Sequence, residues 1–198
     1  IALASLLAPM LGIAPANLFL LPLHVVLLEL VIDPTCSVVL ERQPAEEDIM
    51  DRPPRNPKEQ ILTRTGLFKS VLQGLMIFAA AFGTYFWTVS GNPGSAPTAR
   101  AMGLAILMIA NLLLVQVNSS SSDFITRSIR KLARDKVMWL INLGTLAALA
   151  AILYTPLASV LKLAPLSGEQ PLVVLGMAIA STLWYELVKA ARKMRKRT

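Results

Sequence analysis

Long apolar runs separated by short polar segments dominate the pattern of residues along the chain. Crossing a bilayer as a helix takes about 20 residues, and five runs come close to or exceed this length, at 17–40, 67–89, 101–117, 138–158 and 171–188. A sixth run, 1–13, reaches only about 20 Å at 1.5 Å per residue, so we expect it to be part of a longer span. The pattern predicts an all-α membrane bundle of about six transmembrane helices, forming a single membrane domain over residues 1–198.

Composition agrees with a membrane location and excludes several other classes of protein. The chain is 55% hydrophobic and 16% charged, with a mean hydropathy of +0.59, whereas soluble domains carry about 25% charged residues. Its single cysteine, Cys36, excludes a disulfide framework, and no cluster of Cys and His suggests structural zinc. We therefore expect an integral membrane protein whose immediate partner is lipid.

Lys and Arg residues are concentrated in alternate connecting segments. Six lie in 41–69, five in 118–137 and six in 189–198, whereas 90–100 and 159–170 hold one each. Basic loops stay on the cytoplasmic side of a membrane, so the loops 41–66 and 118–137 and the basic tail 189–198 are predicted to be cytoplasmic. The net charge of +7 does not indicate nucleic-acid binding, because no basic stripe is interleaved with aromatic residues.

Two acidic residues, Glu29 and Asp33, lie inside an apolar run. An acidic side chain at the centre of a membrane helix costs about 2.5–3.5 kcal/mol on insertion scales, and such residues are functional by default. They are four residues apart and so share one face of a helix, about 18 and 24 Å along the axis from Asn17. We expect both carboxylates to face the interior of the bundle at mid-depth, where they would form either a site for a hard cation or a proton relay.

Pro34 follows Asp33 directly and strengthens this interpretation. Proline has no amide proton and disfavours helical dihedral angles in the residue before it, so we expect the helix to unwind near Asp33 and Pro34. Carbonyl groups freed there, near Leu30, could face a cation. The alternative is a simple proline kink in which both acids pair with polar neighbours elsewhere in the bundle.

Three further polar residues are weaker candidates. Asn111, in the run 101–117, could supply a carbonyl oxygen to the cation or form a hydrogen bond between helices. A lone histidine such as His24 is more often a satisfied partner between helices than a ligand. Glu186 lies near the basic tail, where pairing with Lys189 explains it. The candidate metal ligands are therefore Glu29, Asp33 and, more weakly, Asn111.

Two stretches of the sequence resemble a known family. The first is Pro-Leu-His-Val-Val-Leu-Leu-Glu-Leu-Val-Ile-Asp-Pro from Pro22 to Pro34, and the second is Asp-Ile-Met-Asp-Arg-Pro-Pro-Arg from Asp48 to Arg55. Together they resemble the sixth membrane helix and the following cytoplasmic loop of P-type ATPases, closest to the calcium-pump branch. The later runs are similar to that family's seventh to tenth helices, which implies that the chain is the C-terminal membrane domain of a larger pump.

The resemblance also implies a role for several residues of the second apolar run. The family's sixth helix is unwound at mid-membrane and binds the cation through a pattern similar to Asn-Leu-Val-Thr-Asp-Gly. In this chain Glu29, Ile32, Asp33 and Pro34 stand where that pattern has Asn, Thr, Asp and Gly. The eighth-helix Glu expected near 110–112 is absent, and Asn111 is the nearest polar residue. One cation per cycle is therefore more plausible than two, and manganese, magnesium, a monovalent ion or a proton suits these residues as well as calcium.

Family membership implies an enzyme, because these pumps couple ATP hydrolysis to cation transport. The implied cofactors are the transported cation, with ATP and Mg²⁺ held by cytoplasmic domains, whose phosphorylated Asp stands in a D-K-T-G-T motif. That motif is absent from the sequence, so the fragment should not hydrolyse ATP alone. The implied partners are those missing domains, which would contact the loop 41–66, and the preceding membrane helices. The expected location is a cytoplasmic (plasma) membrane, of a bacterial type.

The sequence is also compatible with other functions. The same acids would serve a proton-coupled secondary transporter or channel, a P-type proton pump, or a membrane scaffold without transport. The segment from Asp48 to Arg55 favours the pump, because a secondary transporter has no reason to contain it.

Overall fold

A computed structural model describes residues 18–42, 64–118 and 136–195, together with the single positions Met10 and Met50. Most of these residues are helical, and the others form turns and short connections. The elements are α2 (Pro22–Glu41), α3 (Arg64–Gly91), the short 3-10 helix η2 (Pro93–Ser95), α4 (Ala96–Asn118), α6 (Lys136–Tyr154), α7 (Leu157–Val160) and α8 (Gln170–Arg195). The predicted all-α class is confirmed. The run 1–13 lies outside the described residues except for Met10.

Three of these helices are long and apolar enough to cross a membrane. They cover Pro22–Glu41, Gly66–Gly91 and Ala96–Asn118, and shorter apolar helices cover Trp139–Tyr154 and Gln170–Tyr185. The 20 residues of α2 extend about 30 Å at 1.5 Å per residue, which matches the hydrocarbon core of a bilayer. The chain is therefore an integral membrane protein.

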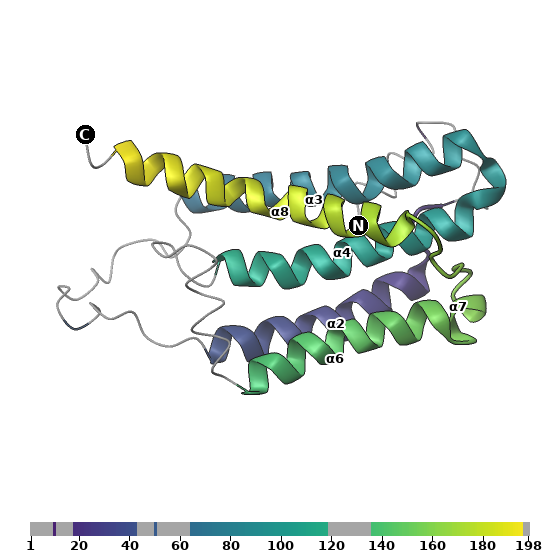
Figure 1. The fold of residues 1–198 in the computed structure, drawn as a ribbon. Helices are drawn as coiled ribbons and strands as arrows, with labels where there is room; N and C mark the ends of the chain where they lie inside the picture. Colours follow the sequence, from purple (N-terminus) through teal and green to yellow (C-terminus); the bar gives the residue numbers. More distant parts are fainter. Residues whose placement is uncertain (1–9, 11–17, 43–49, 51–63, 119–135, 196–198) are drawn as a thin grey trace.

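The five longer helices run side by side, with α4 in the middle (Figure 1). The helices α3 and α8 pack on one side of α4, and α2 and α6 pack on the other. One end of the bundle, on the left in Figure 1, holds the end of α2, the start of α3, the end of α4, the start of α6 and the end of α8. These helix ends are Glu41, Arg64, Asn118, Lys136 and Arg195. This end is the one that leads into the basic segments of the sequence.

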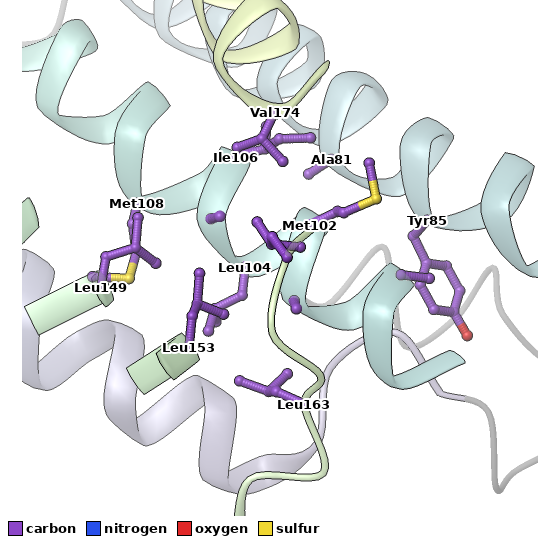
Figure 2. Close-up of a cluster of buried hydrophobic side chains, with 14 of the residues drawn as sticks. Ala81, Tyr85, Met102, Leu104, Ile106, Met108, Leu149, Leu153, Leu163 and Val174 are labelled. Atoms are coloured by element: carbon purple, nitrogen blue, oxygen red, sulfur yellow. The ribbon is translucent and has the colours of Figure 1, made fainter. Parts of the chain in front are cut away.

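The central helix α4 carries many small residues among its buried positions. Its buried residues include Ala99, Ala101, Gly103, Ala105 and Ala110, and small side chains let neighbouring helices approach closely in a membrane. Larger side chains fill the remaining space. Figure 2 shows Met108 beside Leu149 of α6, Leu104 facing Leu153 and Leu163, and Ile106 facing Val174 of α8; all are buried.

The predicted unwinding near Asp33 and Pro34 is wrong. The helix α2 is unbroken from Pro22 to Glu41, with Pro34 inside it. The fixed φ of proline is itself compatible with a helix, and the loss is confined to the bond that the Leu30 carbonyl would have accepted. One residue further along, the Thr35 hydroxyl donates to the Val31 carbonyl at 2.6 Å, which satisfies a neighbouring backbone group.

The apolar run 138–158 is not one helix. The helix α6 ends at Tyr154, and Pro156 begins the separate four-residue helix α7. Proline restricts the residue before it and cannot donate a helical hydrogen bond, which explains the break. Beyond α7, buried Leu161, Leu163 and Leu166 turn back into the core. Residues 155–169 therefore cover the end of the bundle opposite the basic segments; we call them the outer segment.

Candidate cation site

The helix α2 has two chemically different faces. Its buried residues are His24, Leu28 and Val39, which pack against the rest of the bundle. The side chains of Glu29, Asp33, Pro34 and Ser37 are exposed. Because Glu29, Asp33 and Ser37 are spaced four residues apart, they form a polar stripe along one side of the helix. The structure thus places both predicted acids together, but on the face that points away from this bundle. The expectation that they face the interior of these helices is wrong, because the buried face of α2 is formed by His24, Leu28 and Val39.

The stripe has the chemistry of an incomplete cation site. Residues four apart on a helix have Cβ atoms about 5–6 Å apart, so both carboxylates can reach one ion. Hard divalent cations take oxygen ligands, and Ca²⁺ takes about six to eight of them. Among the residues that the structure describes, no group of three or more His, Cys, Asp or Glu could hold a metal ion. Two carboxylates therefore make only part of a coordination shell.

Asn111 is directed to a different partner. Its amide lies 3.5 Å from the Cys36 sulfur, to which it donates a hydrogen bond between α4 and α2. The structure thus does not join the Asn111 amide to Glu29 and Asp33, although Cys36 is only three residues from Asp33. The side chain of Glu186, the other acid considered from the sequence, lies outside the described side chains.

Besides the Asn111–Cys36 contact, two further hydrogen bonds attach α2 to its neighbours. Near the helix start, Nε2 of the fully buried His24 lies 2.6 Å from the carbonyl oxygen of Leu161 in the outer segment. Near the helix end, the hydroxyl groups of Thr35 and Thr145 of α6 lie 3.2 Å apart. The prediction that His24 is a satisfied partner inside the bundle is confirmed. Threonines inside apolar runs are the signal that could have pointed to the second bond, since they bridge membrane helices.

The position of Arg100 in the structure differs from the one that its sequence context indicated. Its place in the polar segment 90–100 indicated an exposed outer connection. Instead it lies in the first turns of α4 with only 3% of its surface exposed, and its Nε donates to the Leu18 carbonyl at 2.7 Å. It therefore fixes the backbone that leads into α2, at the same end of the bundle as His24.

Comparison with known proteins places these features in a family. Residues 17–191 match a family model described as "Cation transporting ATPase, C-terminus". The match covers most of the chain, including α2 with its acidic stripe.

Individual relatives are similar over most of this chain and over little of their own length. A calcium-transporting ATPase of Bacillus subtilis is 26% identical over 164 residues, which are 82% of this chain and 18% of that protein. The calcium-transporting ATPase type 2C member 2 of Rattus norvegicus is 25% identical over 76% of this chain and 16% of its own. A cation-transporting ATPase of Synechocystis is 26% identical over 78% and 18%. The chain therefore spans less than a fifth of the length of the curated relatives that it matches.

Proposed function

Because the chain belongs to the family of cation-transporting ATPases, as the C-terminal membrane part of such a protein, we propose that it forms the ion-translocating part of an ATP-driven P-type pump for a divalent cation. Glu29 and Asp33 bind the ion. ATP and Mg²⁺ are bound by cytoplasmic domains outside this chain, and the loop 41–66 contacts those domains. The pump acts in the plasma membrane of a bacterial cell.

The observation that carries the proposal is the exposed pair of carboxylates on an otherwise apolar helix. Glu29 and Asp33 are exposed in this bundle, yet an ionised acid in the hydrocarbon region does not face lipid. Another part of the full-length protein must therefore cover this face. A covering helix that brings oxygen atoms would complete the coordination shell that the two acids begin.

A divalent cation suits two carboxylates, because their two negative charges balance the ion in a medium of low dielectric constant. The names of two relatives, both calcium-transporting ATPases, support the same choice. A proton pump is the second candidate: neighbouring acids in a membrane can also carry protons, and then no metal ion beyond Mg²⁺ bound to ATP is needed.

The test is ATP hydrolysis by the full-length protein at constant Mg–ATP, with Ca²⁺, Mn²⁺ or a monovalent cation added in turn. We expect one divalent cation to stimulate the wild type. Asp33→Asn and Glu29→Gln should each raise the half-saturating concentration of that ion by about tenfold or more, because each removes a charged ligand. The control is Glu169→Gln, which changes an exposed acid in the outer segment and should leave the ion dependence unchanged.

Two results would count against the proposal. If no added ion changes turnover while Asp33→Asn abolishes it, the proton pump replaces the divalent-cation pump. If Asp33→Asn and Glu29→Gln both behave like the wild type, the acidic stripe is not the transport site.

A further inference from the structure

The inner face of α2 carries a group that the ion site itself does not use. His24 lies five residues before Glu29 on the same unbroken helix. None of its surface is exposed, and it occupies the face opposite the acidic stripe. Its contacts therefore bear on where α2 is held and not on the coordination shell.

Both ring nitrogens of His24 are engaged, which defines the proton arrangement. The backbone amide of Leu21 donates to Nδ1 at 3.2 Å. Since an amide can only donate and a carbonyl can only accept, the ring proton is on Nε2, which donates to the Leu161 carbonyl at 2.6 Å. The imidazole thus joins the first turn of α2 to the outer segment.

The Leu161 carbonyl is held in place by the end of α7. There the amides of Lys162 and Leu163 donate to the carbonyls of Ser159 and Ala158, at 3.1 and 2.8 Å. With Lys162 in the left-handed region at φ 52°, these bonds form a Schellman motif. Leu161 and Leu163 are buried on either side of it. The acceptor that His24 uses is therefore a helix-end carbonyl fixed by the core.

The attachment is completed on the far side of the acids. Thr35, two residues after Asp33, is within hydrogen-bond distance of Thr145 in α6. Glu29 and Asp33 thus lie between His24, bonded to Leu161 just after α7, and Thr35, bonded to α6, while Cys36 adds a contact with Asn111 of α4 next to Thr35. The His24 bond is the only one of these three on the side of the acids toward the start of α2, so its loss would let that part of the helix rotate or shift and would move the carboxylates.

We infer that His24 is a positioning residue for the cation site: through the Leu161 carbonyl it fixes the rotation and depth of α2, and so the places of Glu29 and Asp33. This inference rests on the proposed function of the two acids. It predicts that loss of the His24 bond weakens ion binding without removing a ligand, and that it leaves the maximal rate largely unchanged.

The experiment compares two amide replacements in the full-length protein. The amide nitrogen of glutamine can take the place of Nε2 and donate to Leu161, whereas asparagine is too short to reach it. We expect His24→Asn to raise the half-saturating concentration of the activating ion about tenfold, as loss of an orienting partner does, with kcat within about twofold. His24→Gln should behave like the wild type. Hydrogen exchange of the peptide 18–27 should become faster in His24→Asn only.

Tyr154→Phe is the matched control. It removes the hydrogen bond from the Tyr154 hydroxyl to the Leu166 carbonyl, which also ties α6 to the outer segment but involves no residue of α2. It should leave the half-saturating concentration unchanged.

The outcomes separate the inference from the proposed function. If Asp33→Asn shifts the ion dependence but His24→Asn does not, or if His24→Gln and Tyr154→Phe weaken ion binding as much as His24→Asn, the positioning role is overturned and the ion site stands. Unchanged hydrogen exchange in His24→Asn overturns it as well. If Asp33→Asn has no effect on the ion dependence, the proposed function fails, and the positioning role fails with it.

Discussion

Each polar residue of α2 takes its role from the side of the helix on which it lies. Glu29 and Asp33 are exposed, whereas His24 is buried and Thr35 is half-buried. The inner residues are bonded within the bundle, as required where no water is present. Thr35 takes part in two hydrogen bonds. Its single hydroxyl proton is donated to the Val31 carbonyl at 2.6 Å. The Thr35 oxygen is therefore the acceptor in the 3.2 Å hydrogen bond with the Thr145 hydroxyl.

The direction of this bond predicts an asymmetry between two substitutions. Thr35→Val removes the acceptor and leaves the buried Thr145 hydroxyl without it, which should cost about 1 kcal/mol of stability. Thr145→Val removes only the donor and should cost less than about 0.5 kcal/mol. The double variant should be no less stable than Thr35→Val alone. Thermal unfolding of the detergent-solubilised full-length protein measures all three, and equal losses for the two single variants would contradict the assigned direction.

At the level of elements, the bundle depends on close approach to α4. A Cβ atom added at Gly103 would overlap the ring of Phe19, which is 2% exposed. That ring packs against Phe82 and Tyr85 of α3, with centroid distances of 5.8 and 5.1 Å. Gly103 therefore makes room for an aromatic contact between α3, α4 and the backbone that precedes α2.

Gly103→Ala should consequently destabilise the protein by about 1–3 kcal/mol, the usual cost of overpacking. Gly144→Ala is the matched control, because nothing lies within 4 Å of a Cβ added there. In a helix, alanine is favoured over glycine by up to about 1 kcal/mol, so the control should be neutral or stabilising. Thermal unfolding of the full-length protein compares the two, and equal effects would show that Phe19 yields without cost.

For the whole molecule, the antiparallel order of the helices decides which segments meet at each end. The helix ends that lead into 43–63 and 119–135 and the end of α8 gather at one end of the bundle, and η2 and the outer segment lie at the other (Figure 1). Because basic segments stay on the cytoplasmic side, this arrangement predicts a direction for every helix. His24 and Arg100 are then predicted to lie toward the outer side.

This direction can be tested by labelling single cysteines introduced into a Cys36→Ser background. Gly91→Cys, at the exposed outer end of α3, should react with a membrane-impermeant maleimide in intact cells. Glu41→Cys, at the exposed opposite end of α2, should react only after the membrane is opened. The reverse pattern would invert the orientation and would place the loop 41–66 on the wrong side for contact with ATP-binding domains.

The sequence by itself determined the all-α membrane class and the helix that carries the acids. These follow from local composition: an apolar run reports burial in lipid, and residues four apart share a helix face regardless of the rest of the fold. The break after Tyr154 was missed, because the run 138–158 was taken as one span although Pro156 is a local signal for a helix end. The segments Pro22–Pro34 and Asp48–Arg55 also indicated the cation-transporting ATPase family, because their sequences resemble motifs of that family.

Only the tertiary structure decided where each polar group finds its partner. Spacing along α2 could not show that the acids face outward while His24 bonds to Leu161, which is 137 residues away. Nor could it show that Asn111 donates to Cys36 or that Arg100 is buried. Pro34 predicted unwinding, yet the helix continues, because packing on α4 and α6 holds it against the loss of one backbone bond. The partner of each polar group depends on which helices pack together and on their relative depth in the bundle. Both are determined by contacts between segments that are far apart in the sequence.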